Sequence, residues 1–235
     1  MVGLMHDDVV GWAESMVPKL AGRANEAERL RALPQATIDD CEAIDIWSMV
    51  IPASRGGHGL GMRTLCEMAA TLAHGCASTA WTVSFLTLHN WFVLKAPGDV
   101  QEAVFDGRRS VRMATPLAPG GEAIPVVGGH RVSGRWQWAT GIQHADLVSI
   151  AAFVPREGGR PTARVFFLRV DEIDIVDVWH TSGMRGTGSN DVVARDLFVP
   201  EHRSMPFEHL RGDDPPGFAV HPDPFIRYPM SSVLC

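Results

Sequence analysis

Cysteine and basic side chains are scarce in this chain of 235 residues, and each scarcity excludes a class of protein. The four cysteines, Cys41, Cys66, Cys76 and Cys235, include no C-x-x-C pair, and no histidine lies at finger spacing from them. We therefore expect no zinc site and no disulfide framework, and a cytoplasmic location. With 21 Lys and Arg against 27 Asp and Glu, the formal charge is −6. Because proteins that track phosphates need clustered basic side chains, we expect no nucleic-acid partner.

Long apolar runs are also absent. The N-terminal segment MVGLMHDDVV has no basic region followed by an apolar core, so a signal peptide is not expected. The most apolar run, residues 80–94, contains His89 and Asn90 and is too short to span a bilayer. It is typical of a buried helix, and we expect no membrane partner. The chain also lacks a metal-ligand cluster, a G-x-S-x-G elbow and an internal repeat.

The apolar residues change period near residue 108. Before it the spacing is helical. One helix is expected to begin near Asp7 and another near Thr37, where Asp40 is in capping-box position. Further helices are expected over 62–74 and 78–94. After it the period is two, which predicts strands over 111–116, 131–140, 147–154, 164–170, 173–179 and 191–199. Gly128–Gly129 is expected to form a two-residue hairpin turn. The strands number six to eight and fit a sandwich or barrel.

These patterns divide the chain into three parts. We expect an N-terminal helical domain over residues 1–108 and a β-domain over 109–210. Residues 211–235 are expected to be a linker that ends in RYPMSSVLC, which is typical of the first turn of a helix. The fold class is therefore α+β.

The stretch GRWQWATG, residues 134–141, places two tryptophans and a threonine at alternate positions. In a strand Trp136, Trp138 and Thr140 would share one face. One interpretation is sheet core, which is where strand tryptophans usually lie. The other is an aromatic wall that ends in a hydroxyl donor, suited to a flat ligand with heteroatoms at its edge.

Two further features have a structural and a functional interpretation. His89, in TLHNW, is either a satisfied core histidine or a desolvated imidazole that donates or relays a proton. GMRGTGSND, residues 183–191, has the glycines and hydroxyls of a phosphate cradle but leads from strand to strand, so it is either a wide turn or a ligand-lining loop.

Several stretches together resemble the acyl-CoA dehydrogenase superfamily: IPASRGGHGLG, VSGRWQWATG, TSGMRGTGSNDV and LFVPEHR. Within it, TAWTVSFLTLHNW and MATPLAPGGEA are more similar to the flavin-dependent monooxygenase branch, which includes the oxygenase components that act on p-hydroxyphenylacetate, dibenzothiophene and a secosteroid. The resemblance implies an acyl-CoA dehydrogenase-like fold: an all-α domain, then a β-barrel or sandwich, then a C-terminal helical bundle. The bundle is expected to be missing or truncated here, together with a second catalytic residue beyond Cys235.

The same resemblance implies a function. The chain would be the oxygenase component of a two-component system that hydroxylates an aromatic or polycyclic small molecule through a C4a-hydroperoxyflavin. Its partner would be a flavin reductase that supplies reduced FMN, with FAD as the other flavin. The resemblance also implies a homo-oligomer, a tetramer or dimer, where the bundle is present.

Roles for individual residues follow from the resemblance as well. Thr140 would lie near flavin N5, and His89 near the flavin peroxide. Met113, Thr115, Trp138 and Trp179 would contact the cofactor. Two alternatives stay open: an FAD-dependent acyl-CoA dehydrogenase, and a non-catalytic remnant that associates with other subunits.

Overall fold

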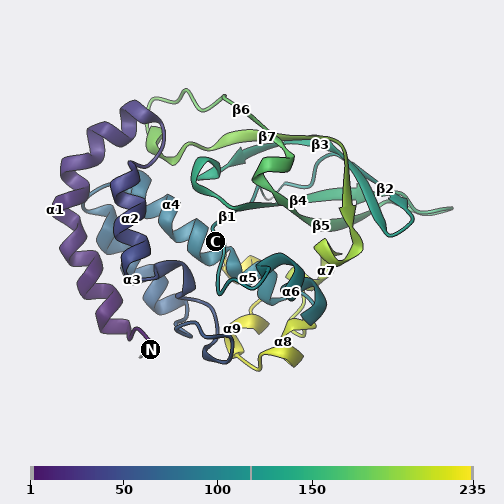
Figure 1. Cartoon of the computed structure of the whole chain (residues 1–235), viewed down its shortest axis with the longest axis horizontal. Coiled ribbons are helices and arrows are strands. Elements are labelled where there is room, and N and C mark those ends of the chain that lie inside the picture. Colours follow the sequence, from purple (N-terminus) through teal and green to yellow (C-terminus); the bar gives the residue numbers. More distant parts are fainter. Residues whose placement is uncertain (1–2, 117, 234–235) are drawn as a thin grey trace.

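A helical part and a curved β-sheet lie side by side in the computed structural model, which describes residues 3–116 and 118–233 (Figure 1). The helices are α1 (His6–Leu30), α2 (Gln35–Ala43), α3 (Met62–Ala73), α4 (Ala77–Leu88), α5 (Asn90–Leu94), α6 (Gly98–Phe105), α7 (Glu208–Arg211), α8 (Gly217–Val220), α9 (Pro224–Arg227) and α10 (Met230–Val233). The strands are β1 (Met113–Ala114), β2 (Glu122–Val126), β3 (Gly129–Ala139), β4 (Leu147–Val154), β5 (Thr162–Arg169), β6 (Asp174–Val176), β7 (Asn190–Pro200) and β8 (Ser204–Pro206).

The strands form one mixed sheet. Its order is β6-β7-β3-β2-β4-β5-β8, and β1 pairs with β4 outside this path. β1 and β2 run parallel to β4, and the other pairs are antiparallel. The predicted change from helical to strand period near residue 108 is confirmed.

Alternate residues of β4 and β5 enter two different apolar cores. Val148 and Phe166 lie in a core made by side chains of the sheet itself. Their neighbours Leu147 and Phe167 lie in the larger core with the helices. These two strands are therefore buried on both faces, which explains their nearly continuous apolar sequences. The larger core also contains Phe225, so it extends across the boundaries that the sequence predicts at residues 108 and 210.

The C-terminal segment, residues 208–233, is more helical than the linker expected from its prolines. Asp223 caps α9 by accepting the Phe225 N–H at 2.9 Å, and Pro224 occupies the first helical turn. α10 agrees with the helical turn predicted for RYPMSSVLC, whose last two residues lie outside the described part of the chain.

Three local predictions are wrong in detail. α2 begins before Thr37, and Asp40 accepts hydrogen bonds from Lys19 and Arg23 of α1 instead of closing a capping box. The hairpin turn is Val127–Gly128, because Val126 pairs with Gly129 in the ladder. In each case a contact made in the folded chain decides the local geometry.

The helix expected over 78–94 is interrupted at His89, where α4 ends and α5 begins. The Asn90 amide donates to the Thr87 carbonyl at 3.1 Å and to the Leu86 carbonyl at 3.4 Å. Such side-chain bonds compete with the backbone pattern of a continuous helix. The interruption lies at the residue that the sequence analysis identified as a functional candidate.

Candidate active site

The two tryptophans of GRWQWATG do not share a face. Trp136 is 2% exposed and donates from Nε1 to the Ala151 carbonyl at 2.8 Å, whereas Trp138 is 61% exposed. The β3–β7 register shifts between Trp136 and Ala139, and Trp138 has a φ of 66°. A bulge adds one residue to the strand and so reverses the alternation of side chains. The expected common aromatic wall is therefore wrong: Trp136 belongs to the core, and Trp138 faces outward.

Thr140 lies just beyond the bulge and is buried, with 8% of its surface exposed. Its Oγ1 contacts Ser189 Oγ at 2.9 Å, and Ser189 Oγ contacts Thr187 Oγ1 at 2.9 Å. Thr187 Oγ1 in turn donates to the Met184 carbonyl at 2.9 Å. The end of β3 is thus joined by a chain of three hydroxyls to the loop before β7.

The direction of this hydroxyl chain follows from counting protons. The Met184 carbonyl can only accept, so the single hydroxyl proton of Thr187 is used there. Ser189 must then donate to Thr187, and Thr140 must donate to Ser189. Thr140 is left with free lone pairs, so the chain makes it a hydrogen-bond acceptor toward a ligand instead of the expected donor. The neighbouring Gly141 N–H is also occupied, by the Thr187 carbonyl at 2.9 Å.

Trp179 also contacts this loop. Its Nε1 donates to the Met184 carbonyl at 3.0 Å, and its backbone N–H donates to Asn190 Oδ1 at 3.1 Å. The structure thus brings Trp179 and Thr140 to one loop, the GMRGTGSND stretch. This supports the ligand-lining interpretation of that stretch.

His89 lies at the C-terminal end of α4 and is fully buried. Its Nδ1 contacts the Met113 carbonyl at 2.8 Å, and its Nε2 has no hydrogen-bond partner among the described residues. Burial lowers the pKa of His89 to about 4, although the bond to Met113 opposes the shift. The ring is therefore neutral near pH 7, with the proton on Nδ1 and a lone pair on Nε2.

The end of β3 packs against the helix that carries His89. A Cβ added at Gly141 would lie 2.8 Å from Thr82 Cγ2 and 3.3 Å from Leu86 Cδ1, both on α4. His89 follows Thr82 by two turns, or roughly 10 Å along the axis. The same helix therefore supports the hydroxyl chain and the imidazole.

Two predicted residues lie on or beside β1. Met113 is buried and provides the carbonyl that His89 contacts. Thr115 is half-buried, and its Oγ1 contacts Ser149 Oγ of β4 at 2.8 Å. Met113 is therefore in contact with His89, whereas Thr115 is in contact with the sheet.

Sequence reasoning missed Thr187, Ser189 and Asn190. All three are buried. Ser189 contacts Thr140, Asn190 accepts the Trp179 N–H, and Thr187 contacts Ser189. The signal was present in GTGSN, whose glycines and hydroxyls were noted without assignment to individual side chains.

A hollow of about 880 Å³ lies elsewhere, between the end of α6 and the turn after β5, and none of the predicted site residues lines it. Its three arginines are paired with acids: Arg169 with Asp171 at 2.8 Å, Arg203 with Glu172 at 2.9 Å and Arg108 with Asp146 at 4.0 Å. Since each cation is already neutralised locally, this hollow is not a strong anion site. The described residues contain no cluster of potential metal ligands, and no helix among them is long and apolar enough to cross a membrane.

Known proteins resemble this chain along most of its length. Residues 4–101 match the model of the acyl-CoA dehydrogenase N-terminal domain. The chain is 34% identical over 215 residues to a pigment production hydroxylase of a Rhodococcus species, covering 92% of this chain and 56% of the relative. It therefore carries an acyl-CoA dehydrogenase N-terminal domain. A second relative is the flavin-dependent monooxygenase oxygenase subunit HsaA of Mycobacterium tuberculosis, 30% identical over 96% of this chain and 57% of the relative.

Solved structures of the superfamily agree with the fold. The crystal structure of a 3-HSA hydroxylase from Rhodococcus aligns with a TM-score of 0.91 at 30% identity, covering 98% of this chain and 60% of that one. XiaF from Streptomyces, in complex with FADH2 and glycerol, aligns with a TM-score of 0.82 at 33% identity, over 88% of this chain and 53% of that one. The acyl-CoA dehydrogenase-like fold predicted from the sequence is confirmed. The chain spans 56–57% of the length of the first two relatives.

Proposed function

We propose that this chain belongs to the acyl-CoA dehydrogenase superfamily. We propose further that it is the oxygenase component of a two-component flavin-dependent monooxygenase that hydroxylates an aromatic or polycyclic small molecule. The observation that carries the proposal is His89, a buried neutral imidazole on the helix that also supports Thr140. Its Nε2 has no hydrogen-bond partner within residues 3–116 and 118–233. Relatives with this function in their names include a resorcinol hydroxylase oxygenase component from Rhizobium, 30% identical over 213 residues. The same relatives support a separate flavin reductase as partner, and the resemblance supports a homo-oligomer, a tetramer or dimer.

The residues around α4 fit a flavin. A flavin ring is flat and apolar on its faces and carries donors and acceptors along its edge. Trp138 offers an exposed indole, Thr140 a buried acceptor hydroxyl, and His89 an unpartnered nitrogen. Reduced flavin, unlike the oxidised form, carries a hydrogen on N5, which suits an acceptor such as Thr140.

We propose reduced FMN as the cofactor, with Trp138, Thr140 and Trp179 among the residues that hold it and with Met113 and Thr115 at the edge of the same site. FAD is the alternative flavin, because one neighbouring structure contains FADH2. FMN is present in another structure of the same fold, at 20% identity. When bound, the flavin supplies the oxygen chemistry.

The chain's own residues supply positioning and proton control. Thr140 accepts a hydrogen bond and so holds the N–H edge of the reduced ring. His89, neutral and with its Nδ1 proton committed to Met113, would accept a hydrogen bond at Nε2, and a phenolic hydroxyl of an aromatic substrate is a suitable donor. The buried surroundings of both residues keep water from competing for these groups.

An anaerobic titration with oxidised and reduced FMN tests this function. We expect reduced FMN to bind more tightly, and an oxygen pulse to give a transient absorbance distinct from that of oxidised FMN. In the Thr140→Ala variant we expect hydrogen peroxide release to rise by about one to two orders of magnitude, because loss of one positioned group typically costs about 2–4 kcal/mol.

The alternatives give different results in the same experiment. Reduction of bound FAD by an acyl-CoA thioester would indicate an acyl-CoA dehydrogenase. Failure to bind either flavin would contradict the proposal for this chain and favour a non-catalytic subunit. Unchanged peroxide release in Thr140→Ala would show that Thr140 does not take part in flavin binding.

A further inference from the structure

The interruption between α4 and α5 places two consecutive polar side chains against the segment that leads into β1. His89 and Asn90 are both fully buried. Each contacts the backbone of this segment: Asn90 at Val111 and His89 at Met113. Since only Arg112 lies between Val111 and Met113 along an extended chain, both contacts reach the same edge of the segment.

Asn90 binds Val111 as a neighbouring strand would. Its Oδ1 accepts the Val111 N–H at 2.9 Å, and its Nδ2 donates to the Val111 carbonyl at 2.9 Å. Nδ2 also donates to the Thr87 carbonyl of α4 at 3.1 Å, which ties the amide to the helix. Because both ends of the amide are used, it fixes the position and the direction of this peptide segment.

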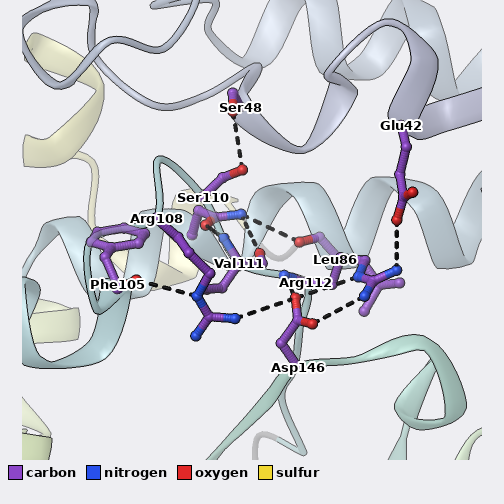
Figure 2. A network of polar contacts seen from close by, with 10 residues as sticks. Glu42, Ser48, Leu86, Phe105, Arg108, Ser110, Val111, Arg112 and Asp146 are labelled. Atoms are coloured by element: carbon purple, nitrogen blue, oxygen red, sulfur yellow. Dashed lines mark hydrogen bonds and ion pairs between the residues drawn. The ribbon is translucent and has the colours of Figure 1, made fainter.

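The next residue is held from the opposite side, by Asp146 (Figure 2). Asp146 Oδ2 accepts the Arg112 N–H at 2.9 Å, and the Asp146 N–H donates to the Arg112 carbonyl at 2.7 Å. The Arg112 guanidinium also pairs with Asp146 at 3.0 Å and with Glu42 of α2 at 2.9 Å. Residues 111 and 112 are therefore held on both sides just before the chain reaches Met113.

The Met113 carbonyl determines which nitrogen of His89 carries the proton. A carbonyl can only accept, so its contact with Nδ1 at 2.8 Å requires a proton there. In the neutral ring the lone pair then lies on Nε2, which has no partner in the part of the chain that the structure describes. Displacement of the carbonyl would remove this preference and allow the proton to move to Nε2.

We propose that Asn90 is a positioning residue for His89: by holding Val111, it presents the Met113 carbonyl to Nδ1 and keeps the Nε2 lone pair free to accept a hydrogen bond. The importance of this for turnover rests on the proposed function. The tautomer itself does not, because it is a property of the chain without flavin or substrate.

Gln101 offers a matched control. It is 1% exposed, and its Nε2 donates to the Leu94 and Ala96 carbonyls at 3.2 and 2.9 Å. It is thus a second buried amide that donates to two backbone carbonyls in the same helical region. None of its contacts involves residues 111–113, so its loss should not move the Met113 carbonyl.

The test is ¹⁵N NMR of the histidine ring nitrogens in the flavin-free chain near pH 7, with the His89 signals assigned by their loss in His89→Gln. We expect a single Nδ1–H tautomer in the unmodified chain and in Gln101→Leu. In Asn90→Leu we expect the ratio of Nδ1–H to Nε2–H tautomers to fall about tenfold, the effect of losing one net hydrogen bond. Asn90→Asp should restore the single tautomer, because its buried carboxyl, when protonated, provides one donor and one acceptor for Val111.

Two results would overturn the proposal. One is an Nε2–H tautomer of His89 in the unmodified chain, a measurement that does not depend on whether any variant folds. The other is a folded Asn90→Leu variant whose His89 tautomer is unchanged. If flavin binding fails while these spectra behave as expected, the proposed function is wrong and the positioning role of Asn90 stands.

Discussion

Two buried histidines, His89 and His144, make the stability of the folded chain depend on pH. Burial lowers the pKa of His89 to about 4, and burial together with the nearby Arg112 lowers that of His144 to about 4. His144 Nε2 accepts the Leu33 N–H at 3.1 Å, a bond that needs the unprotonated nitrogen. Both side chains are therefore neutral in the folded chain at pH values where the unfolded chain already binds protons.

The sign of the pH effect follows from this difference. Between pH 6.5 and about 4 the unfolded state binds more protons than the folded state, so the free energy of unfolding falls as the pH is lowered. For His89 the loss across this window is roughly 3 kcal/mol. We expect urea denaturation at pH 7.5, 6.0 and 4.5 to show this decline. A His144→Gln variant should decline less steeply, and an identical decline would contradict the contribution of His144.

At the residue scale the sequence singled out candidate residues but did not predict how their side chains are arranged. His89 and Thr140 were identified because a polar side chain in an apolar helix and a hydroxyl after a tryptophan strand are unusual. The shared face of Trp136 and Trp138 was wrong, because a bulge is decided by pairing with β7 and leaves no mark in the local alternation. Ser189 was missed because its contact with Thr140 joins residues 49 positions apart.

At the element scale, the contact between β3 and α4 depends on a residue without a side chain. Gly141 has a φ of 71°, and a Cβ there would lie 2.8 Å from Thr82 Cγ2. We expect Gly141→Ala to lower the free energy of unfolding by about 2–4 kcal/mol, since both the left-handed backbone and the clash oppose it. Thermal unfolding measured by circular dichroism would show the loss.

Gly128 provides the matched control for Gly141. Its φ of 81° is equally unfavourable for alanine, but no atom lies within 4 Å of an added Cβ. Gly128→Ala should therefore cost only the backbone strain, about 1–2 kcal/mol. Equal losses in the two variants would show that the packing of Gly141 on α4 contributes nothing.

Helices and strands whose apolar residues repeat with a clear period were predicted well, but the residues at which some elements begin and end were not. α3 and β4 agree closely with the predicted ranges 62–74 and 147–154, because each has a long apolar pattern of one period. The hairpin turn was displaced by one residue, and α2 begins two residues earlier than Thr37. Strand register and tertiary ion pairs decide these ends, and neither is visible in a local window.

At the scale of the whole molecule, the class of fold followed from the order of helical and strand patterns, but the sheet order did not. β3 pairs with β7 across more than 50 residues of sequence, and β1 joins β4 from outside the main path. The sharing of β4 and β5 between two cores could be suspected only from their continuous apolar sequences. Pairing between strands far apart in the sequence depends on how the apolar faces of the whole chain pack together. The residues of one strand alone do not specify its partner.

The C-terminal segment is attached to the helical part through backbone carbonyls, and Lys95 is the residue that binds most of them. Its Nζ donates to the Ile226 and Tyr228 carbonyls at 2.8 Å each, and it lies 4.5 Å from the centre of the Trp91 ring. Trp91 Nε1 donates to the Phe225 carbonyl at 2.8 Å. The prolines of this segment limit its internal hydrogen bonds, so these contacts with α5 hold it in place.

Lys95→Met should therefore release the C-terminal segment while the rest of the fold persists. The methionine fills a similar volume but leaves the Ile226 and Tyr228 carbonyls without their donor. We expect limited proteolysis within residues 208–233 to accelerate by about tenfold, the effect of losing one net hydrogen bond on a local opening equilibrium. Lys19→Met, which removes only a half-exposed ion pair with Asp40, should leave that cleavage rate unchanged. Equal cleavage rates in the Lys95→Met variant and the unmodified chain would mean that apolar packing alone, including that of Phe225 and Ile226, holds the segment.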